Sequence, residues 1–261
     1  MPIPRCLTIA GSDSGGGAGI QADLKAFARA GCFGMSAIVA LTAQNTVEVT
    51  AVHAVPPEFV RAQLEAVFSD IGADAAKTGM LFSAPVIEAV ADFLGAHPLP
   101  LVVDPVMVAS SGARLLREDA VGALVGRLFP LATVVTPNLP EAAALAGEGD
   151  PEELARRIHE LGAPAVVVTG GHGENGADVL FDGTDLVRIP VERHATHATH
   201  GAGCTHSATL AALLARGLSL VEAARGAAAA ASDAVLHGLA ELGGGEGPVD
   251  VLDLLHLHEA L

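Results

Sequence analysis

The chain has 261 residues, of which 51% are hydrophobic, so it is long enough for the core of one large domain or two small ones. Its 14 Lys and Arg against 30 Asp and Glu give a formal net charge of −16, which argues against nucleic acids and anionic membranes as partners. No signal peptide, no apolar run long enough to span a membrane, no disulfide framework and no zinc-binding spacing of the three cysteines can be recognised, and we therefore expect a cytoplasmic protein.

Short β-branched runs alternate with longer helical patterns along the whole chain. The patterns predict strands over residues 6–10, 35–43, 47–55, 74–78, 101–104, 133–136 and 165–169, and a hairpin over 178–181 and 186–190. They predict helices over 21–30, 57–71, 84–94, 118–129, 139–145, 151–161, 205–214 and 220–239, with a short helix at the end. This alternation predicts an α/β fold, a three-layer α/β/α sandwich around a mainly parallel sheet, with residues 1–261 in one domain.

Ligands of such sheets bind where the strands end at their carboxyl termini. Several residues with chemical potential fall at these ends: the glycine loop 11–19, Gln44, Asp104, and the segments 138–141, 170–172 and 200–204. The glycine loop lacks the Gly-x-Gly-x-x-Gly spacing of dinucleotide-binding proteins and the Gly-Lys-Ser/Thr of nucleoside-triphosphate loops. Either a flexible surface loop or a loop that closes over a small substrate fits this pattern.

The most informative segment is the turn 201–204, Gly-Ala-Gly-Cys, which leads into an Ala- and Leu-rich helix. The backbone N–H groups of Ala202, Gly203 and Cys204 are expected to be unpaired donors at the positive end of the helix dipole, which attracts anions. A thiol in the first turn of a helix typically has a lowered pKa. We therefore expect the 201–204 turn to hold a developing phosphoryl charge and the attacking group.

Seven ordered blocks carry a resemblance to a known family. They lie at residues 10–25, 41–46, 77–81, 103–107, 136–141, 170–172 and 200–204. Together they resemble the hydroxymethylpyrimidine/phosphomethylpyrimidine kinases of thiamin biosynthesis, which belong to the ribokinase-like superfamily. The resemblance implies ATP-dependent phosphorylation of 4-amino-5-hydroxymethyl-2-methylpyrimidine and then of its monophosphate, with Mg²⁺. It also implies a small β flap beside the sandwich and a homodimer.

The resemblance implies a role for each matching residue. In the 201–204 turn, Gly201, Ala202 and Gly203 form the anion hole and Cys204 accepts the proton of the substrate hydroxyl. Asp104 and Glu141 are hard oxygen donors suited to Mg²⁺, although a strand end and a helix start explain them equally well. The nucleotide phosphates are assigned to Asn138, Thr169 and Gly171.

Gln44 is the main candidate for substrate specificity. Its amide can donate to a ring nitrogen and accept from the neighbouring amino group, as Gln and Asn do when they read adenine. Asp23 and Met80 are assigned to the same pocket, with a helix-surface carboxylate and core packing as the respective alternatives. Gly11 and Ala18 of the glycine loop complete the predicted substrate-binding set.

The chain departs from its relatives at the lysines. Thr169 stands where relatives have Lys, another Lys is expected near Ser232, and the whole chain holds only Lys25 and Lys77. A pyridoxal or pyridoxine kinase of the same superfamily and a non-catalytic pyrimidine-binding module therefore remain as alternative functions. The histidines at 194, 197, 200 and 206 lack the further ligands of a zinc site, and we expect them to be solvated or to line a substrate lid.

Overall fold

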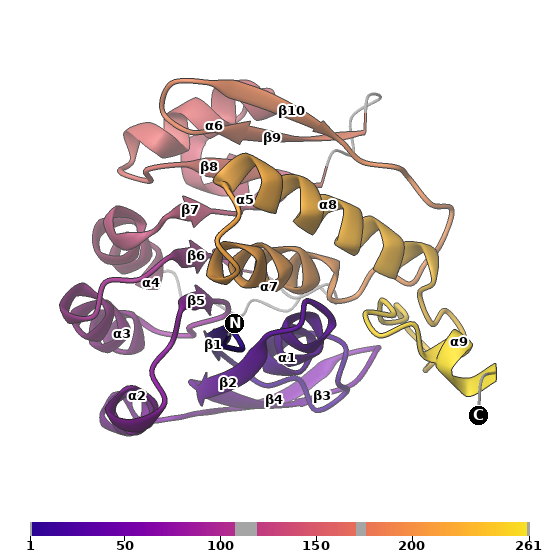
Figure 1. Ribbon diagram of the computed structural model, residues 1–261, viewed down its shortest axis with the longest axis horizontal. Helices are drawn as coiled ribbons and strands as arrows, with labels where there is room; N and C mark the ends of the chain where they lie inside the picture. The colour runs from indigo at the N-terminus through magenta and orange to yellow at the C-terminus, as the bar shows by residue number, and fades with distance from the viewer. Residues whose placement is uncertain (1, 108–118, 171–175, 260–261) are drawn as a thin grey trace.

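A computed structural model describes residues 2–107, 119–170 and 176–259, in which eight strands form one sheet between two layers of helices (Figure 1). The order across the sheet is β10-β9-β8-β7-β6-β5-β1-β2. The six strands from β8 to β2 in this order run parallel, and β9 and β10 are antiparallel additions at one edge. The bounds are β1 (Arg5–Ala10), β2 (Phe33–Ile38), β5 (Ala75–Thr78), β6 (Leu101–Val103), β7 (Val134–Val135), β8 (Val166–Val168), β9 (Ala177–Phe181) and β10 (Leu186–Pro190).

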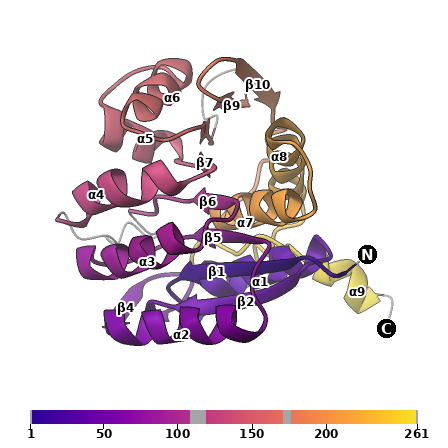
Figure 2. The ribbon, with the colours of Figure 1, turned by 60° about the vertical axis from the view of Figure 1, so that its left-hand side comes forward.

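Helices cover both faces of the sheet (Figure 2). One face carries α1 (Gly19–Arg29), α7 (Ala202–Ala215) and α8 (Leu220–Leu236), and the other carries α2 (Pro57–Asp70), α3 (Ala84–Ala96), α4 (Ala120–Ala123), α5 (Leu139–Ala146) and α6 (Pro151–Glu160). The central strands are runs of buried valine because side chains on both of their faces are covered. The predicted three-layer α/β fold is confirmed.

The remaining helical segments differ in detail from the prediction. The helix predicted over 118–129 begins, within the described residues, as α4 and continues as a π-helical stretch (Leu124–Leu128) and a 3-10 turn (Phe129–Leu131). The last helix, α9, spans Leu254–Glu259. None of the helices in the described part of the chain combines the length and apolar character that crossing a membrane requires.

The predicted strand over 35–43 divides into two strands of different sheets. β2 ends at Ile38 in the central sheet, and β3 (Ala40–Gln44) pairs antiparallel with β4 (Val49–Ala54) to form a separate two-stranded flap. Val39 connects them, since its N–H donates to Ala10 of the central sheet and its carbonyl accepts from Val55. The expected β flap is therefore present, but no Gly or Pro in the sequence marks the bend.

Candidate active site

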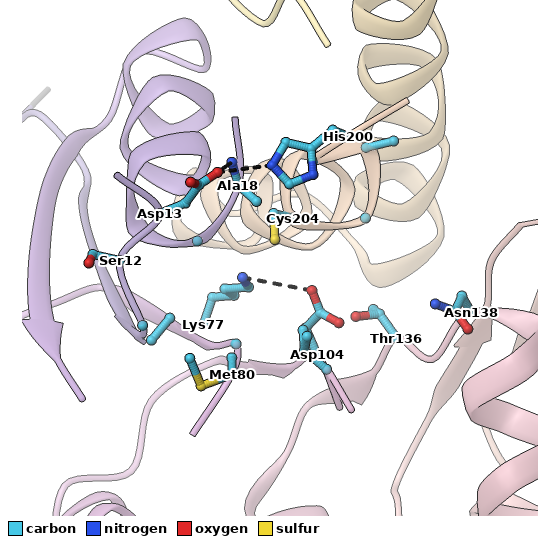
Figure 3. Close-up of a pocket in the computed structure, with 18 of the residues that line it drawn as sticks. Ser12, Asp13, Ala18, Lys77, Met80, Asp104, Thr136, Asn138, His200 and Cys204 are labelled. Atoms are coloured by element: carbon cyan, nitrogen blue, oxygen red, sulfur yellow. Dashed lines mark hydrogen bonds and ion pairs between the residues drawn. The ribbon is translucent and has the colours of Figure 1, made fainter. Parts of the chain in front are cut away.

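One cavity lies at the carboxyl ends of the strands and brings together most of the predicted site residues (Figure 3). Of the predicted set, its lining includes Gly11, Ala18, Gln44, Met80, Asp104, Asn138, Glu141, Thr169, Gly201, Ala202, Gly203 and Cys204. Gly171 lies outside the described residues. Asp23 is absent from the described lining of this cavity. Segments that are distant in sequence thus meet at the edge of the sheet where the predictions placed a ligand.

The 201–204 turn begins α7 three residues earlier than predicted. Gly201 precedes the helix in the left-handed region, at φ 86°, and the carbonyl of Gly17 occupies the place where a side chain would be. The N–H of Ala202 donates to the carbonyl of Thr199 at 3.1 Å, so the prediction of three unpaired donors is wrong for this one. Within the described residues, the first-turn N–H groups of Gly203 and Cys204 have no protein acceptor, and they remain available to an anion.

The pKa of Cys204 moves opposite to the prediction. Its side chain is half-buried by accessible surface, yet its sulfur is enclosed by protein atoms, and this burial raises the pKa of the thiol to about 12. The carboxylates of Asp23 and Asp104 raise the pKa further, whereas Lys77 and an N–H from Gly19 lower it. The helix terminus therefore does not decide the outcome, and Cys204 is a thiol at neutral pH in the substrate-free protein.

Lys77 is a cavity residue to which the sequence analysis assigned no role. It lies on β5 with a fully buried side chain, and its Nζ contacts both carboxylate oxygens of Asp23, at 2.9 and 3.1 Å, and Oδ2 of Asp104 at 3.7 Å. Burial alone would lower the pKa of Lys77, but the charge of Asp23 and then those of Cys204 and Asp104 raise it above its ordinary value. A lysine in the predicted strand 74–78, where both faces of the sheet are expected to be buried, is the signal that could have identified this residue.

The structure corrects the assignment of Asp23. Its side chain is fully buried beneath the cavity, where it accepts from Thr8 at 2.6 Å and pairs with Lys77. It is therefore neither a pocket-lining group nor the helix-surface carboxylate considered as the alternative. Because Asp23 lies on the buried face of α1, with Ile20 and Phe27, it acts as the buried counter-ion of Lys77.

Asp104 and Glu141 face the cavity as two neighbouring carboxylates. Asp104 follows β6 and accepts from the Ser207 hydroxyl at 2.8 Å. Glu141 forms a capping box with Asn138 at the start of α5, where its Oε2 accepts from the Asn138 N–H at 3.0 Å. Burial, and then the charge of Asp104, raises the pKa of Glu141 to about 8. Two carboxylates that suppress each other's ionisation favour the binding of a cation between them.

The oxygen ligands at this pair of carboxylates fit Mg²⁺ better than a metal ion that takes all of its ligands from protein side chains. The described residues contain no group of three or more His, Cys, Asp or Glu side chains that could hold a metal ion. The hydroxyl of Thr136, which follows β7, lies buried beside Asp104 and has no hydrogen-bond partner among the described residues (Figure 3). Mg²⁺ commonly binds through one or two carboxylates and retains several water molecules. A hydroxyl without another partner can accept a hydrogen bond from such a water and so orient it.

The flap and the ends of β1 and β5 supply the substrate side of the cavity. Gln44 ends β3, and its Oε1 accepts from the Thr42 hydroxyl at 3.2 Å, which leaves its amide N–H groups for a ligand. Gly11 and Met80 touch, since the Gly11 N–H donates to the Met80 carbonyl at 3.1 Å and a side chain at 11 would meet the Met80 methyl. Met80 both packs in the core and lines the cavity, so its two readings are compatible.

The glycine loop is held by two residues that the sequence analysis did not single out for this purpose. Asp13 is buried, and its carboxylate accepts from backbone N–H groups of the loop and from Nε2 of His200 at 2.9 Å. Burial alone would raise the pKa of Asp13, but His200 and the loop N–H groups lower it below its ordinary value. The prediction of solvated histidines is wrong for His200 and His206, which are buried, whereas His194 is half-buried and His197 is exposed. His200 lines the cavity.

The sequence as a whole was then compared with known proteins. The profile of the family described as Phosphomethylpyrimidine kinase matches residues 13–250. The chain belongs to the phosphomethylpyrimidine kinase family. It is 53% identical over 257 residues to the hydroxymethylpyrimidine/phosphomethylpyrimidine kinase of Rhizobium meliloti (strain 1021), an alignment that covers 93% of this chain and 95% of the relative.

Solved structures resemble this family member along nearly its whole length. An ADP complex of Bacillus subtilis pyridoxal kinase matches with a TM-score of 0.89 and 40% identity, covering 97% of this chain and 99% of the other. The pyridoxal kinase from Staphylococcus aureus in complex with AMP-PCP and pyridoxal matches with a TM-score of 0.87 and 36% identity, covering 96% and 94%. The predicted family, its ribokinase-like fold and the prediction of a kinase are thereby confirmed.

Proposed function

We propose that this phosphomethylpyrimidine kinase family member transfers a phosphoryl group from ATP to 4-amino-5-hydroxymethyl-2-methylpyrimidine and then to its monophosphate, in thiamin biosynthesis. One observation carries the proposal: the lining of a single cavity brings together Gln44, the 201–204 turn and the acidic residues Asp104 and Glu141. The names of the relatives support the pyrimidine substrate, and the ADP and AMP-PCP complexes of the structural neighbours support ATP as the donor.

The residues of the cavity account for phosphoryl transfer by positioning and charge stabilisation. We assign the transferred group to the N–H groups of Gly203 and Cys204 and to the ammonium of Lys77, which line the same cavity. Asp104 and Glu141 would hold Mg²⁺, which when bound supplies positive charge to the phosphate oxygens. We assign Asn138 and Thr169, which form a bridge between their backbones, to the nucleotide phosphates, and Gly171 remains assigned there by its sequence alone.

The proton of the substrate hydroxyl is assigned to Cys204. A thiol with a pKa of about 12 is a weak acceptor at neutral pH, so its contribution belongs at the lower end of what general bases provide. The backbone donors of the 201–204 turn then supply the larger share of the stabilisation. Replacement of Cys204 separates the two contributions because it leaves the backbone N–H groups in place.

A pyridoxal kinase activity is the second candidate, since both structural neighbours named above are pyridoxal kinases. Gln44 distinguishes the two. The aminopyrimidine offers a ring nitrogen and an adjacent amino group to the Gln44 amide, whereas pyridoxine has no matching edge. A preference for the pyrimidine therefore depends on this side chain.

The test is kcat/KM for the pyrimidine alcohol and for pyridoxine in wild type and in Gln44→Leu. Loss of two polar contacts at about 1–3 kcal/mol each lowers the pyrimidine value by about 30-fold to 10⁴-fold, and the pyridoxine value falls much less. Gln63→Leu is the matched control, because the Gln63 amide bonds the backbone of Ile38 outside the cavity. Equal losses on both alcohols, or a wild-type preference for pyridoxine, would refute the proposal.

The homodimer stays a proposal, and it is supported by the flap. The flap exposes Leu41 and Val52, at 46% and 38% of their surface, and most of β4 is open to solvent. A second copy that covered these side chains would remove them from water. Light scattering measures the molecular mass in solution of wild type and of Val52→Lys. A wild-type protein with the mass of a monomer would contradict the homodimer.

A further inference from the structure

The buried carboxylate of Asp13 accepts hydrogen bonds from several backbone N–H groups of the glycine loop 11–19. Oδ1 accepts from the N–H of Gly15 at 2.8 Å, and Oδ2 accepts from Gly17 at 3.1 Å and Ala18 at 2.9 Å. The Asp13 side chain is only 3% exposed, so these bonds are shielded from competing water. The alternative of a flexible surface loop does not fit this arrangement. The loop has one preferred shape, and Asp13 determines it.

The same carboxylate fastens the glycine loop to the 201–204 turn. His200 directly precedes the turn, and its Nε2 donates to Oδ2 of Asp13 at 2.9 Å across 187 residues of sequence (Figure 3). A side chain at Gly17 would meet the imidazole ring at 2.4 Å, and one at Gly201 would meet the Gly17 carbonyl at 1.8 Å. The loop and the turn are therefore in direct contact, with glycine on both sides of the contact.

His200 is itself held from the far side by the chain near its C-terminal end. Its backbone N–H donates to the carbonyl of Gly247 at 3.2 Å, and its carbonyl accepts from Val249 at 3.1 Å. The backbone of His200 is thus held in place by two hydrogen bonds. The imidazole, in turn, fixes the position of the Asp13 carboxylate through its hydrogen bond. Ala18 on one side and the free donors of the turn on the other line the same cavity.

We propose that Asp13 and His200 are positioning residues for phosphoryl transfer, whose hydrogen bond sets the place of the 201–204 turn relative to the substrate side of the cavity. The proposal rests on the proposed function for its kinetic part. It is supported by the cavity, whose lining includes Ala18 and Gly19 of the loop together with Cys204 of the turn. Loss of the bond separates two halves of one site without removing a group that contacts the reacting atoms.

The sharpest test compares His200→Gln with His200→Asn. The amide nitrogen of Gln reaches the position of the imidazole Nε2, whereas that of Asn falls short of Asp13. We expect His200→Asn to lower kcat by about 10²-fold with little change in KM for ATP, as a misplacement of about 1 Å does, and His200→Gln to recover most of the rate. His197→Asn, at an exposed histidine of the same segment, is the control and should keep the wild-type rate.

Amide hydrogen exchange of the peptide covering residues 11–19 tests the same bond without reference to catalysis. Exchange should be faster in His200→Asn and close to wild type in His200→Gln. If wild type does not phosphorylate the pyrimidine, the proposed function fails and exchange alone decides the positioning role. Equal kcat in the two variants, or unchanged exchange in His200→Asn, would overturn the proposal. Should His200→Asn fail to fold, Asp13→Asn, which loses one carboxylate oxygen, provides the same two readouts.

Discussion

The substitution Asp23→Asn tests whether the buried carboxylate is a counter-ion or a substrate ligand. Asp23 and Lys77 are both 0% exposed, so solvent does not screen their attraction, and the Lys77 ammonium loses its two short contacts when the charge is removed. Removal of one partner of a buried pair typically costs about 3–5 kcal/mol because the other charge stays buried. At about 2–4 °C per kcal/mol for a chain of this size, the melting temperature should fall by about 6–20 °C.

Urea unfolding followed by far-UV circular dichroism measures this loss, because the chain has no Trp or Tyr to report by fluorescence. Glu65→Gln is the matched control: the Glu65 carboxylate pairs with Arg61 at the same 2.9 Å, but both side chains are more than half exposed, and its stability should stay close to that of wild type. The second measurement is KM for the pyrimidine in wild type and in Asp23→Asn. An Asp23→Asn protein with wild-type stability and a raised KM for the pyrimidine would refute the counter-ion role and restore the direct contact predicted from the sequence.

Three further outcomes follow from the geometry of the site and of α7. Cys204→Ala should keep nucleotide binding and slow the single-turnover rate by about 10²-fold, and an unchanged rate would leave only the backbone of the turn in the mechanism. Asp104→Asn and Glu141→Gln should each raise the Mg²⁺ concentration for half-maximal rate, and wild-type titration curves would return both to structural roles. Burial lowers the pKa of His206 from 6.5 to about 4, so between these values the unfolded chain takes up a proton at His206 that the folded chain does not, and the contribution of His206 to folding stability falls as pH falls. Compared with His206→Leu, wild type should lose about 3 kcal/mol across that window, and parallel curves of stability against pH would contradict this.

Periodicity and strand-end logic predicted the layers and the location of the cavity. Asp104, Asn138 and the 201–204 turn were found because each follows a strand or opens a helix, and a parallel sheet brings such ends together. The division of residues 35–43 between two sheets was missed, because the apolar run continues through Val39 without Gly or Pro and only the tertiary pairing bends the chain there. Local patterns therefore locate a site better than they locate a bend.

The electrostatics of the site could not be predicted from local sequence. A first-turn position suggested a lowered pKa for Cys204, but burial and two carboxylates from β6 and α1 outweigh the helix terminus, and neither is near Cys204 in the chain. Asp13 and His200 were missed as a pair for the same reason, since 187 residues separate them. In each case the residue that determines the pKa or the hydrogen bond lies in another element of the fold. The sequence therefore identifies the residue, but its pKa and its partners depend on the tertiary structure.

The charges around the cavity explain how a kinase can work here without the lysines common in its relatives. Among the described lining residues Lys77 is the one lysine, and its ammonium already contacts Asp23 and Asp104, while Asp13, Asp104 and Glu141 contribute carboxylates. Such a cavity repels the polyphosphate of ATP unless a divalent cation is present between the carboxylates and the phosphates. Burial, and then the negative charge of Asp104, raises the pKa of Glu141, which makes a cation beside it favourable. We therefore propose that magnesium converts a cavity rich in carboxylates into one that binds a nucleotide, and that Thr169, at a position where the family resemblance implies lysine, makes that dependence stronger.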